Sequence, residues 1–340
     1  MPVISLPPEL ESAIEVELRT VPGSQWMSAA RGLSERYRAE RDPSAGAPRP
    51  MARGSKEALG YAALVLPAAY AQLAGAMAAT AERAPSFEPA TMLDLGSGPG
   101  TALWAAAEQW PTLATIHAWE REPAFIELGR KLAASSTIPT VRGAQWRQVT
   151  LGGALPQHTP RYDLIVIGHV LNEMDERVRE ALVRSAWEHC SGVLLIVEPG
   201  TSAAFPVVRA ARDLLLAEGA RTLAPCAHDE PCPLVNDWCH FPQRLHRPHF
   251  QRRAKEGSAG WEEAKFSYAA MARFAPDRPV WGRLIHQPQV NKVGAGLVIS
   301  SREGIVRPRI LRRDRPAFKA AADLKWGDAV EVEVEITGEG

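Results

Sequence analysis

The sequence predicts an α/β fold in which a mostly parallel sheet is covered by helices on both faces. Between residues 91 and 218, short apolar runs alternate with helix-length amphipathic segments, as in repeated strand–helix units. The runs "DLIVIG" and "GVLLIVE" are almost entirely apolar, which is typical of strands buried on both sides. The chain has 340 residues, 46% of them hydrophobic, and is therefore long enough for one large core with appended segments.

We expect five segments along the chain. They are a helical N-terminal region (1–85), a sheet-forming core (86–222), a basic insertion that contains cysteines (223–280), a C-terminal hairpin that completes the sheet (281–327) and a tail (328–340). The N-terminal stretches "PPELESAIEVEL" and "SQWMSAARGLSERYRAE" repeat apolar residues at spacings of three and four, as amphipathic helices do.

An uncharged stretch of the N-terminal region, from Ala58 to Ala81, is long enough to span a membrane. It is mostly alanine and contains Gly60, Gly75 and Pro67, so few large apolar side chains remain to drive insertion. We therefore expect a buried helix that is kinked at Pro67, and no membrane partner.

The expected strands of the core are "TMLDLG", "TIHAWE", "RYDLIVIG" and "GVLLIVEP", and a helical segment follows each of them. After the last of these helices the chain becomes polar and basic. "VWGRLIHQPQ" and "AGLVISSREG" form the predicted hairpin, and the alternating tail "AVEVEVEIT" is expected to be a strand with a solvated glutamate face.

A glycine-rich loop joins the first strand of the core to its first helix. In "LDLGSGPGT", Asp94 precedes three glycines, and glycine permits positive φ and close approach of the backbone to a ligand. Ligands of open α/β sheets bind at the carboxyl ends of the strands, where this loop lies. Glu120 ends the second strand, and an acidic residue at that point can accept hydrogen bonds from both hydroxyls of a ribose.

The spacing of the glycines separates two cofactor classes. The dinucleotide fingerprint is G-x-G-x-x-G, whereas this loop reads G-x-G-x-G and is followed by Thr101. The loop resembles motif I of the class I S-adenosylmethionine-dependent methyltransferases, and "YDLIVIGHVLNEMD" and "LLIVEPGT" resemble their fourth and fifth strands. The resemblance implies a class I methyltransferase (Rossmann-like) fold with S-adenosylmethionine as cofactor, and nicotinamide binding is the alternative.

The resemblance also implies roles for individual residues. The glycine loop would surround the methionine part of the cofactor, Glu120 would hold the ribose, and Asn172 with Glu173 would lie near the methyl group unless they only cap the next helix. The implied cofactor-binding residues are Asp94, Gly96, Ser97, Gly98, Gly100, Glu120 and Asn172.

No catalytic residue is assigned from the sequence. His169 follows the fourth strand and is a candidate base, although a histidine beside a cofactor is more often structural. The region after the fourth strand has neither the N/D-P-P-Y motif of exocyclic-nitrogen methylases nor the Pro-Cys nucleophile of pyrimidine carbon-5 methylases. Cofactor binding is therefore predicted more firmly than turnover, and methyl transfer to ribosomal RNA is the activity we expect.

Three of the four cysteines lie within fourteen positions, in "PCAHDEPCPLVNDWCHF". Thiolates are soft ligands that select zinc or iron–sulfur clusters. The separations between Cys226, Cys232 and Cys239 are wider than the Cys-x2–4-Cys knuckles of zinc sites and resemble the irregular spacing of iron–sulfur sites. Cys190 ends a helix and is expected to pack as a small apolar residue.

The order of several motifs gives a narrower resemblance, over about residues 55–327. It is formed by "YAALVLPAAYAQL", "LDLGSGPGTALWAA", "HVLNEM", "LIVEPGT", "PCAHDEPCPL", "DWCHF", "EAKFSY" and "KWGD". Together they resemble the family of methyltransferase-like assembly factors of the mitochondrial small ribosomal subunit and its bacterial relatives. Members of that family associate with the maturing small subunit and bind a four-iron cluster through four cysteines. The resemblance implies a 4Fe-4S cluster held by Cys226, Cys232 and Cys239.

The fourth cysteine of the family pattern is missing from this chain. The strand that would hold it reads "GLVISSREG", with Ser300 at the position. The fourth ligand is therefore Ser300, a histidine (His228 or His240) that would also suit zinc, or absent. From the order of the elements we expect the cluster at the sheet edge opposite to the methyl group, as a structural site that holds "RLHRPHFQRRAK" against the core.

Charge is unevenly distributed although the formal net charge is zero. Residues 241–320 contain 17 Lys and Arg against 6 Asp and Glu, a local balance of +11. We expect "RLHRPHFQRRAK" and "RPRILRRDRP" to contact the phosphates of small-subunit ribosomal RNA. The N-terminus has no secretory or transit pattern, which predicts a cytoplasmic location. The alternatives are a methyltransferase with a non-RNA substrate and a catalytically silent assembly scaffold.

Overall fold

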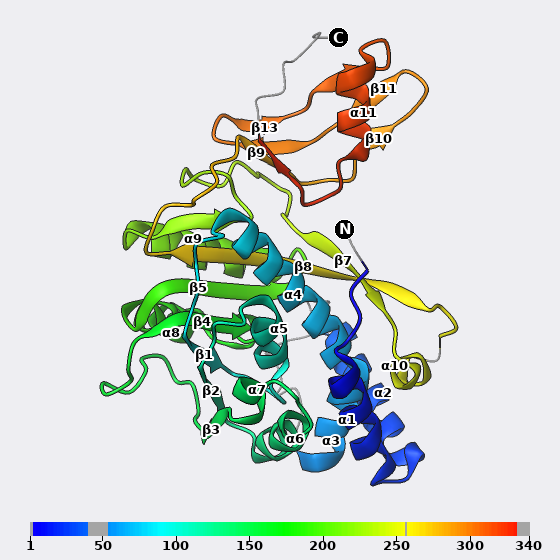
Figure 1. The fold of residues 1–340 in the computed structure, drawn as a ribbon, viewed down its shortest axis with the longest axis vertical. Coiled ribbons are helices and arrows are strands. Elements are labelled where there is room, and N and C mark those ends of the chain that lie inside the picture. Colours follow the sequence, from blue (N-terminus) through cyan, green and yellow to red (C-terminus); the bar gives the residue numbers. More distant parts are fainter. Residues whose placement is uncertain (1–2, 40–53, 256, 332–340) are drawn as a thin grey trace.

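The computed structural model describes residues 3–39, 54–255 and 257–331, and contains a large α/β core and a smaller β-rich lobe formed by the C-terminal part of the chain (Figure 1). The helices of the described part are α1 (Pro8–Arg19), α2 (Gly23–Ala39), α3 (Gly54–Leu64), α4 (Leu66–Arg83), α5 (Thr101–Gln109), α6 (Pro123–Ala134), α7 (Pro139–Arg142), α8 (Glu176–Glu188), α9 (Phe205–Ala217), α10 (His249–Ala254) and α11 (Arg315–Asp323).

The strands of the described part are mostly short. They are β1 (Thr91–Leu95), β2 (Thr115–Glu120), β3 (Gln145–Gln148), β4 (Tyr162–Gly168), β5 (Cys190–Pro199), β6 (Arg221–Ala224), β7 (Phe241–His246), β8 (Trp261–Ala272), β9 (Gly282–Leu284), β10 (Gln289–Val290), β11 (Gly294–Gly296), β12 (Ile299–Ser301), β13 (Gly304–Val306), β14 (Arg309–Leu311) and β15 (Ala329–Val330).

The main sheet has the strand order β3-β2-β1-β4-β5-β8-β6, and β7 pairs with the first half of β8. Strands β1 to β5 are parallel, whereas β8 is antiparallel to β5, β6 and β7. The predicted class I methyltransferase (Rossmann-like) fold, with its mostly parallel sheet, is confirmed. The carboxyl ends of β1, β2, β4 and β5 therefore meet at one edge of the sheet.

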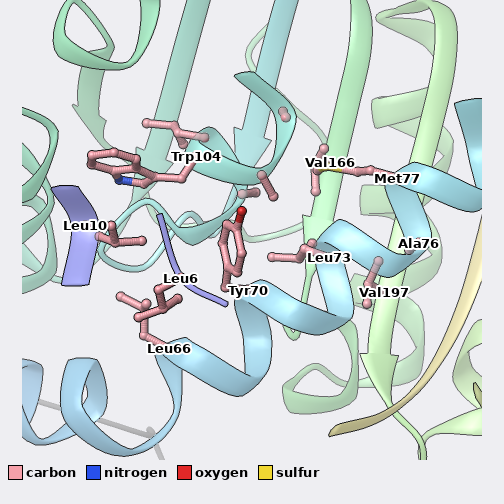
Figure 2. Packing of buried hydrophobic residues seen from close by; sticks show 14 of the residues in the cluster. Leu6, Leu10, Leu66, Tyr70, Leu73, Ala76, Met77, Trp104, Val166 and Val197 are labelled. Atoms are coloured by element: carbon pink, nitrogen blue, oxygen red, sulfur yellow. The ribbon is translucent and has the colours of Figure 1, made fainter. Parts of the chain in front are cut away.

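Both faces of the sheet are covered, as the apolar strands predict. Along β4, Leu164 and Val166 belong to the buried cluster on the side of α4 and α5, whereas Ile165 and Ile167 belong to the cluster on the side of α8 and α9. This alternation follows from the two-residue period of a strand. Figure 2 shows residues of α4, such as Leu73, packed against the first of these faces.

The uncharged N-terminal segment forms α3 and α4, which meet at an angle of 56°. The break comes just before Pro67, in the first turn of α4, where a residue without a backbone N–H is tolerated. The predicted kink in a buried helix is therefore observed as a break between two helices. No single helix of the described chain is long and apolar enough to cross a membrane; this bent pair passes that test only when its two members are combined.

The C-terminal hairpin does not complete the main sheet, and that expectation is wrong. Its strands join a four-stranded sheet, β13-β12-β9-β15, which lies in the C-terminal lobe together with the three-stranded sheet β10-β11-β14. The lobe has its own buried cluster, which includes Leu284, Leu297 and Ile299. The antiparallel strand of the main sheet is β8, because its second half is long, apolar and buried on both faces. Most of the predicted tail, residues 332–340, lies outside the described residues.

Candidate functional site

The glycine loop between β1 and α5 has a conformation that side chains disfavour. Gly96, Gly98 and Gly100 have φ values of 76°, 53° and 85°, all in the left-handed region. A Cβ atom at Gly96 would lie 2.4 Å from Cγ2 of Val170, so that glycine is required by close packing. A Cβ atom at Gly98 would meet nothing within 4 Å, and the backbone is open to a ligand at this point.

Glu120, at the end of β2, is tied to this loop. Its Oε2 accepts a hydrogen bond from the amide of Gly98 at 2.9 Å, and its Oε1 accepts from the amides of Arg121 and Glu122 at 2.8 and 2.9 Å. A carboxylate oxygen has two lone-pair sites, so Oε1 is satisfied and Oε2 can accept one more hydrogen bond. Glu120 is thus oriented toward the loop, and its Oε2 retains an acceptor site for a ligand.

Several buried polar atoms near this edge of the sheet have no hydrogen-bond partner among the described residues. Leaving such a group unpaired costs free energy, so a cluster of them indicates a place for a polar ligand. The atoms, at or just beyond the carboxyl ends of β1, β4 and β5, are Asp94 Oδ2, Ser97 Oγ, His169 Nε2, Asn172 Oδ1 and Glu198 Oε2.

Burial raises the pKa of the two carboxyl groups among these atoms. It raises the pKa of Asp94 to about 8, with the neighbouring Glu120 contributing in the same direction. It also raises the pKa of Glu198 to about 8, although the amides of Leu171 and Val170 donate to that carboxylate and partly offset the shift. Both carboxyl groups can therefore lose a proton when a positively charged ligand arrives.

His169 has an unusual backbone conformation. Its φ of 60° lies in the left-handed region, which few residues other than glycine adopt. Burial lowers its pKa to about 4, so its imidazole is neutral at physiological pH. Its unpartnered Nε2 can accept or donate a hydrogen bond depending on the tautomer, but no described group activates it as a base.

Two groups at this edge were missed by the sequence analysis. Glu198 ends the apolar run of β5, and an acidic residue at the carboxyl end of a buried strand is a signal that could have found it. Tyr61 of α3 packs edge-on against Phe125 at 5.0 Å, and carboxylates that include Glu173 help burial to raise its pKa. Nothing local in the sequence associates α3 with this site.

The cysteine segment and the C-terminal lobe form a second site. Cys226, Cys232, Cys239 and Ser300 line one cavity, together with Tyr268 and other buried side chains. Ser300 comes from β12, and the structure thus brings it to the three cysteines, where the family pattern requires a fourth ligand. Neither candidate histidine lines this cavity.

The three predicted metal ligands line one cavity but do not form a metal-binding group in the described part of the chain. Within the described ranges, no three His, Cys, Asp or Glu side chains are grouped closely enough to hold one ion. Burial raises the pKa of Cys226 and Cys239, and the thiols of this cavity raise it further in Cys239. Without a bound metal these thiols are protonated, because metal binding and deprotonation of cysteine are coupled.

Two buried arginines border the same cavity. Arg283 is 1% exposed, its Nε donates to the carbonyl of Pro225 at 2.8 Å, and its Nη2 has no partner in the described part of the chain. Arg212 is 3% exposed and donates to the carbonyls of His228 and Glu230 at 2.8 and 2.9 Å. Each guanidinium also has a carboxylate partner, Asp213 for Arg212 at 3.2 Å and Glu82 for Arg283 at 3.9 Å. The unpartnered Nη2 of Arg283 and Nε of Arg212 are the donors that remain for an anionic occupant.

The cysteine site lies at the same edge of the main sheet as the glycine loop, and our expectation of the opposite edge is wrong. We overlooked the four-residue strand β6, which runs parallel to β5 and returns the chain to the carboxyl edge before Cys226. Four inter-strand steps separate β1 from β6, which corresponds to about 19 Å. The two sites are therefore lateral neighbours that do not overlap.

The two basic stretches differ in how far their charges are paired. In the first, Arg247 and Lys255 both pair with the carboxylate of Glu262, at 2.8 and 2.5 Å, which fixes α10 to β8. In the second, Arg309 and Arg313 are exposed and have no carboxylate within ion-pair distance in the described chain. The stretch in the C-terminal lobe is therefore the freer of the two to bind an anionic partner.

Comparison with known proteins shows the family to which this chain belongs. The sequence pattern of the family described as mitochondrial small ribosomal subunit Rsm22 matches residues 55–331. The chain belongs to the Rsm22 family. The match includes the glycine loop, the three clustered cysteines and Ser300, and therefore both sites of this Rsm22 family member.

Two curated relatives of this Rsm22 family member are mitochondrial proteins. The human ribosome assembly protein METTL17 is 29% identical over 292 residues, which cover 80% of this chain and 62% of the relative. The Rsm22-cox11 tandem protein 2 of Schizosaccharomyces pombe is 23% identical, and the match covers 72% of this chain and 39% of the relative. The chain thus spans less than two thirds of the length of either relative.

Solved structures with similarity to this chain are methyltransferases, at low identity. Magnesium protoporphyrin IX methyltransferase from Synechocystis PCC 6803, solved with S-adenosylmethionine, is 9% identical with a TM-score of 0.40, over 71% of this chain and 90% of that chain. An O-methyltransferase family protein from Burkholderia thailandensis is 12% identical with a TM-score of 0.41, over 66% of this chain and 61% of that chain.

Proposed function

We propose that this protein is a methyltransferase-like assembly factor of a small ribosomal subunit, which binds S-adenosylmethionine and contacts ribosomal RNA. Membership of the Rsm22 family, over residues 55–331, is the observation that carries the proposal. The human relative is named as a ribosome assembly protein, and the residues that match the family include both candidate sites.

The glycine loop fits S-adenosylmethionine. The open space in front of Gly98 suits close backbone contact, and Glu120 retains one acceptor site for a ribose hydroxyl. Asp94 is the buried carboxyl group suited to the positively charged methionine part, and Asn172 supplies an unpartnered amide oxygen beside it. The cofactor supplies a methyl group attached to a positively charged sulfur, and the residues named here bind and orient it.

We propose that the cysteine cavity binds an iron–sulfur cluster, with zinc as the alternative. Three thiols and Ser300 line the cavity, and the buried Arg212 and Arg283 border it, where positive charge favours thiolate ligands. We propose Cys226, Cys232 and Cys239 as ligands and Ser300 as the fourth. The cluster would join the cysteine segment to the C-terminal lobe, because Ser300 belongs to that lobe.

Methyl transfer to ribosomal RNA is the activity we propose for the cofactor site. A catalytically silent scaffold is the second candidate, and one observation favours it. The unpartnered polar groups of the site are suited to binding, but no group among the described residues would activate His169 as a base. The named relatives are mitochondrial, which favours a mitochondrial location over the cytoplasmic one expected from the sequence.

The test uses the full chain and isolated small ribosomal subunits. Sedimentation should show the protein moving with immature small subunits, and titration calorimetry should show S-adenosylmethionine binding. Transfer of a labelled methyl group to the RNA would establish turnover, whereas binding of both partners without transfer would establish the scaffold. A chain that neither sediments with small subunits nor binds naked ribosomal RNA would contradict the assembly function.

A further inference from the structure

The ribbon formed by β7 and the first half of β8 presents an outer face that no helix of the described residues covers. Along β8, Ala264 and Phe266 are buried toward α4, where Ala264 clusters with Ala71. The alternate residues Trp261 and Lys265 are exposed on the opposite face. In Figure 1 this ribbon extends past α4 beside the N-terminal segment, with the C-terminal lobe at its other end.

At the far end of the ribbon, an exposed tryptophan is stacked with a cation. Trp261 remains 50% exposed although the guanidinium carbon of Arg244 lies 4.1 Å from its ring centroid. Arg244 also pairs with Glu263 at 3.5 Å, and both of those side chains are exposed. The exposed ion pair between Arg244 and Glu263 adds little stability in water, so it does not explain why an exposed tryptophan is present at this position.

At the other end of the ribbon, the face continues into a cluster of aromatic rings. Nζ of Lys265 lies 5.9 Å from the ring of Trp326, which contacts His240 at 4.8 Å. His240 in turn stacks on Trp238, with centroids 5.3 Å apart and planes at 17°, and Trp238 is 38% exposed. We call the whole set the outer stripe; it consists of Arg244, Trp261, Lys265, Trp326, His240 and Trp238.

We propose that the outer stripe binds single-stranded RNA. Unpaired bases would stack on Trp261 and Trp238, and phosphates would lie beside Arg244 and Lys265. Stacking on exposed aromatic rings interleaved with cations is how proteins bind single strands without sequence preference, since every base has a π-face. The proposal deepens the RNA contact of the proposed function and rests on it, but uses residues other than the basic stretch of the C-terminal lobe.

Dimensions and charge favour a single strand over a duplex. Trp261 and Lys265 are four residues apart on one strand, or about 14 Å, which is long enough for about two extended nucleotides. A-form duplexes keep their bases stacked inside and do not offer them to aromatic side chains. Two carboxylates lie beside the stripe: Glu263, which pairs with Arg244, and Asp237, which lies 3.8 Å from His286. Stacking should therefore contribute more than phosphate attraction.

The experiment measures fluorescence anisotropy of a labelled twelve-nucleotide oligouridine and of a duplex RNA of equal length. The variant Trp261→Ala should bind the single strand about 5- to 150-fold more weakly, as expected for one lost stacked base, with an unchanged dependence on salt. Trp261→Phe keeps a ring and should retain most of the affinity. Val16→Ala, at an exposed apolar residue of α1, is the control for surface truncation and should have no effect.

The outcomes separate this proposal from the one on which it rests. If Trp261→Ala and the parent bound the single strand with equal affinity, the proposal that the outer stripe binds RNA would be overturned. Salt-dependent binding of the duplex in the same experiment would still leave the proposed RNA function intact. A parent that binds neither RNA would contradict both. A Trp261→Ala variant that binds oligouridine normally but no longer sediments with small subunits would assign the stripe to a protein contact and overturn RNA as its ligand.

Discussion

The backbone amide of Gly98 donates a 2.9 Å hydrogen bond to Oε2 of Glu120, which lies 22 residues further along the chain. The glycine loop and the acid at the end of β2 are therefore one structural unit before any ligand binds. Since Glu120 is also held by the amides of Arg121 and Glu122, its carboxylate is preorganised and the entropy cost of binding is reduced.

A side chain at Gly98 should abolish cofactor binding. Gly98→Val places three carbon atoms in the open space in front of the loop, so calorimetry should detect S-adenosylmethionine binding in the parent and none in the variant. Gly219→Val is the matched control, because Gly219 also has a positive φ, 83°, and open space around it, but follows α9. Both variants should lose about 1–2 kcal/mol of stability through backbone strain. Equal affinities of the Gly98 variant and the parent would contradict the site.

Asp94 should make the unliganded protein less stable as the pH rises. The folded chain holds the Asp94 proton up to a pH of about 8, whereas the unfolded chain loses it near pH 4. Between these values the folded state binds more protons, so the free energy of unfolding falls with rising pH, by at most about 1.4 kcal/mol per pH unit. Asp94→Asn should make the urea-unfolding midpoint fall less steeply between pH 5 and 7.5, with the pKa of Glu198, also raised to about 8, accounting for the fall that remains. The variant should also bind the cofactor more weakly. If the unfolding midpoints of the variant and the parent changed with pH in the same way, the raised pKa of Asp94 would be refuted.

The basic stretch of the C-terminal lobe should govern the salt dependence of RNA binding. Arg309→Glu/Arg313→Glu removes two exposed cations and should lower the slope of log affinity against log salt by roughly 1–2, across unrelated RNA sequences. Arg19→Glu/Arg177→Glu makes the same change in net charge on α1 and α8 and should leave the slope unaltered. If both double variants behave alike, only the net charge of the protein matters and the lobe is not the contact.

Loss of a clustered cysteine should remove the metal. Cys232→Ala, purified without oxygen, should lack the brown chromophore, iron and sulfide of the parent, because the variant loses a thiolate ligand and an alanine side chain cannot ligate iron. Cys190→Ala is the control, since Cys190 is buried in β5 and does not line the cavity. Stoichiometric zinc without sulfide in the parent would replace the cluster by a zinc site.

The serine at the fourth position should make the cluster labile. Ser300 is 7% exposed in the same cavity, and a hydroxyl ligates iron more weakly than a thiolate does. Ser300→Cys should raise the iron content and slow the loss of the chromophore in air. Ser301→Cys, one residue along β12, is the matched control and should do neither, because Ser301 does not line the cavity. Identical bleaching rates for Ser300→Cys and the parent would place residue 300 outside the ligand set.

Several features could be predicted from the sequence because they depend on neighbouring residues. The alternation of apolar strands and helices predicts the fold class, because it is a periodic pattern of the chain. The glycines before α5 and the acid at the end of β2 predict the ligand loop, because glycine alone has the backbone freedom that the loop needs. The three cysteines are grouped by their spacing alone. Their common cavity with Ser300 follows from the family pattern, and the structure agrees with it.

Other features were decided only by the tertiary structure, because they depend on pairing between distant segments. The four-residue β6 is too short for a periodic signal, yet it sets the sheet edge at which the cysteines lie. The choice of β8 over the hairpin as the antiparallel strand depends on burial on both faces. Tyr61 reaches the cofactor edge, and Arg212 and Arg283 reach the cysteine cavity, through packing that no local pattern contains.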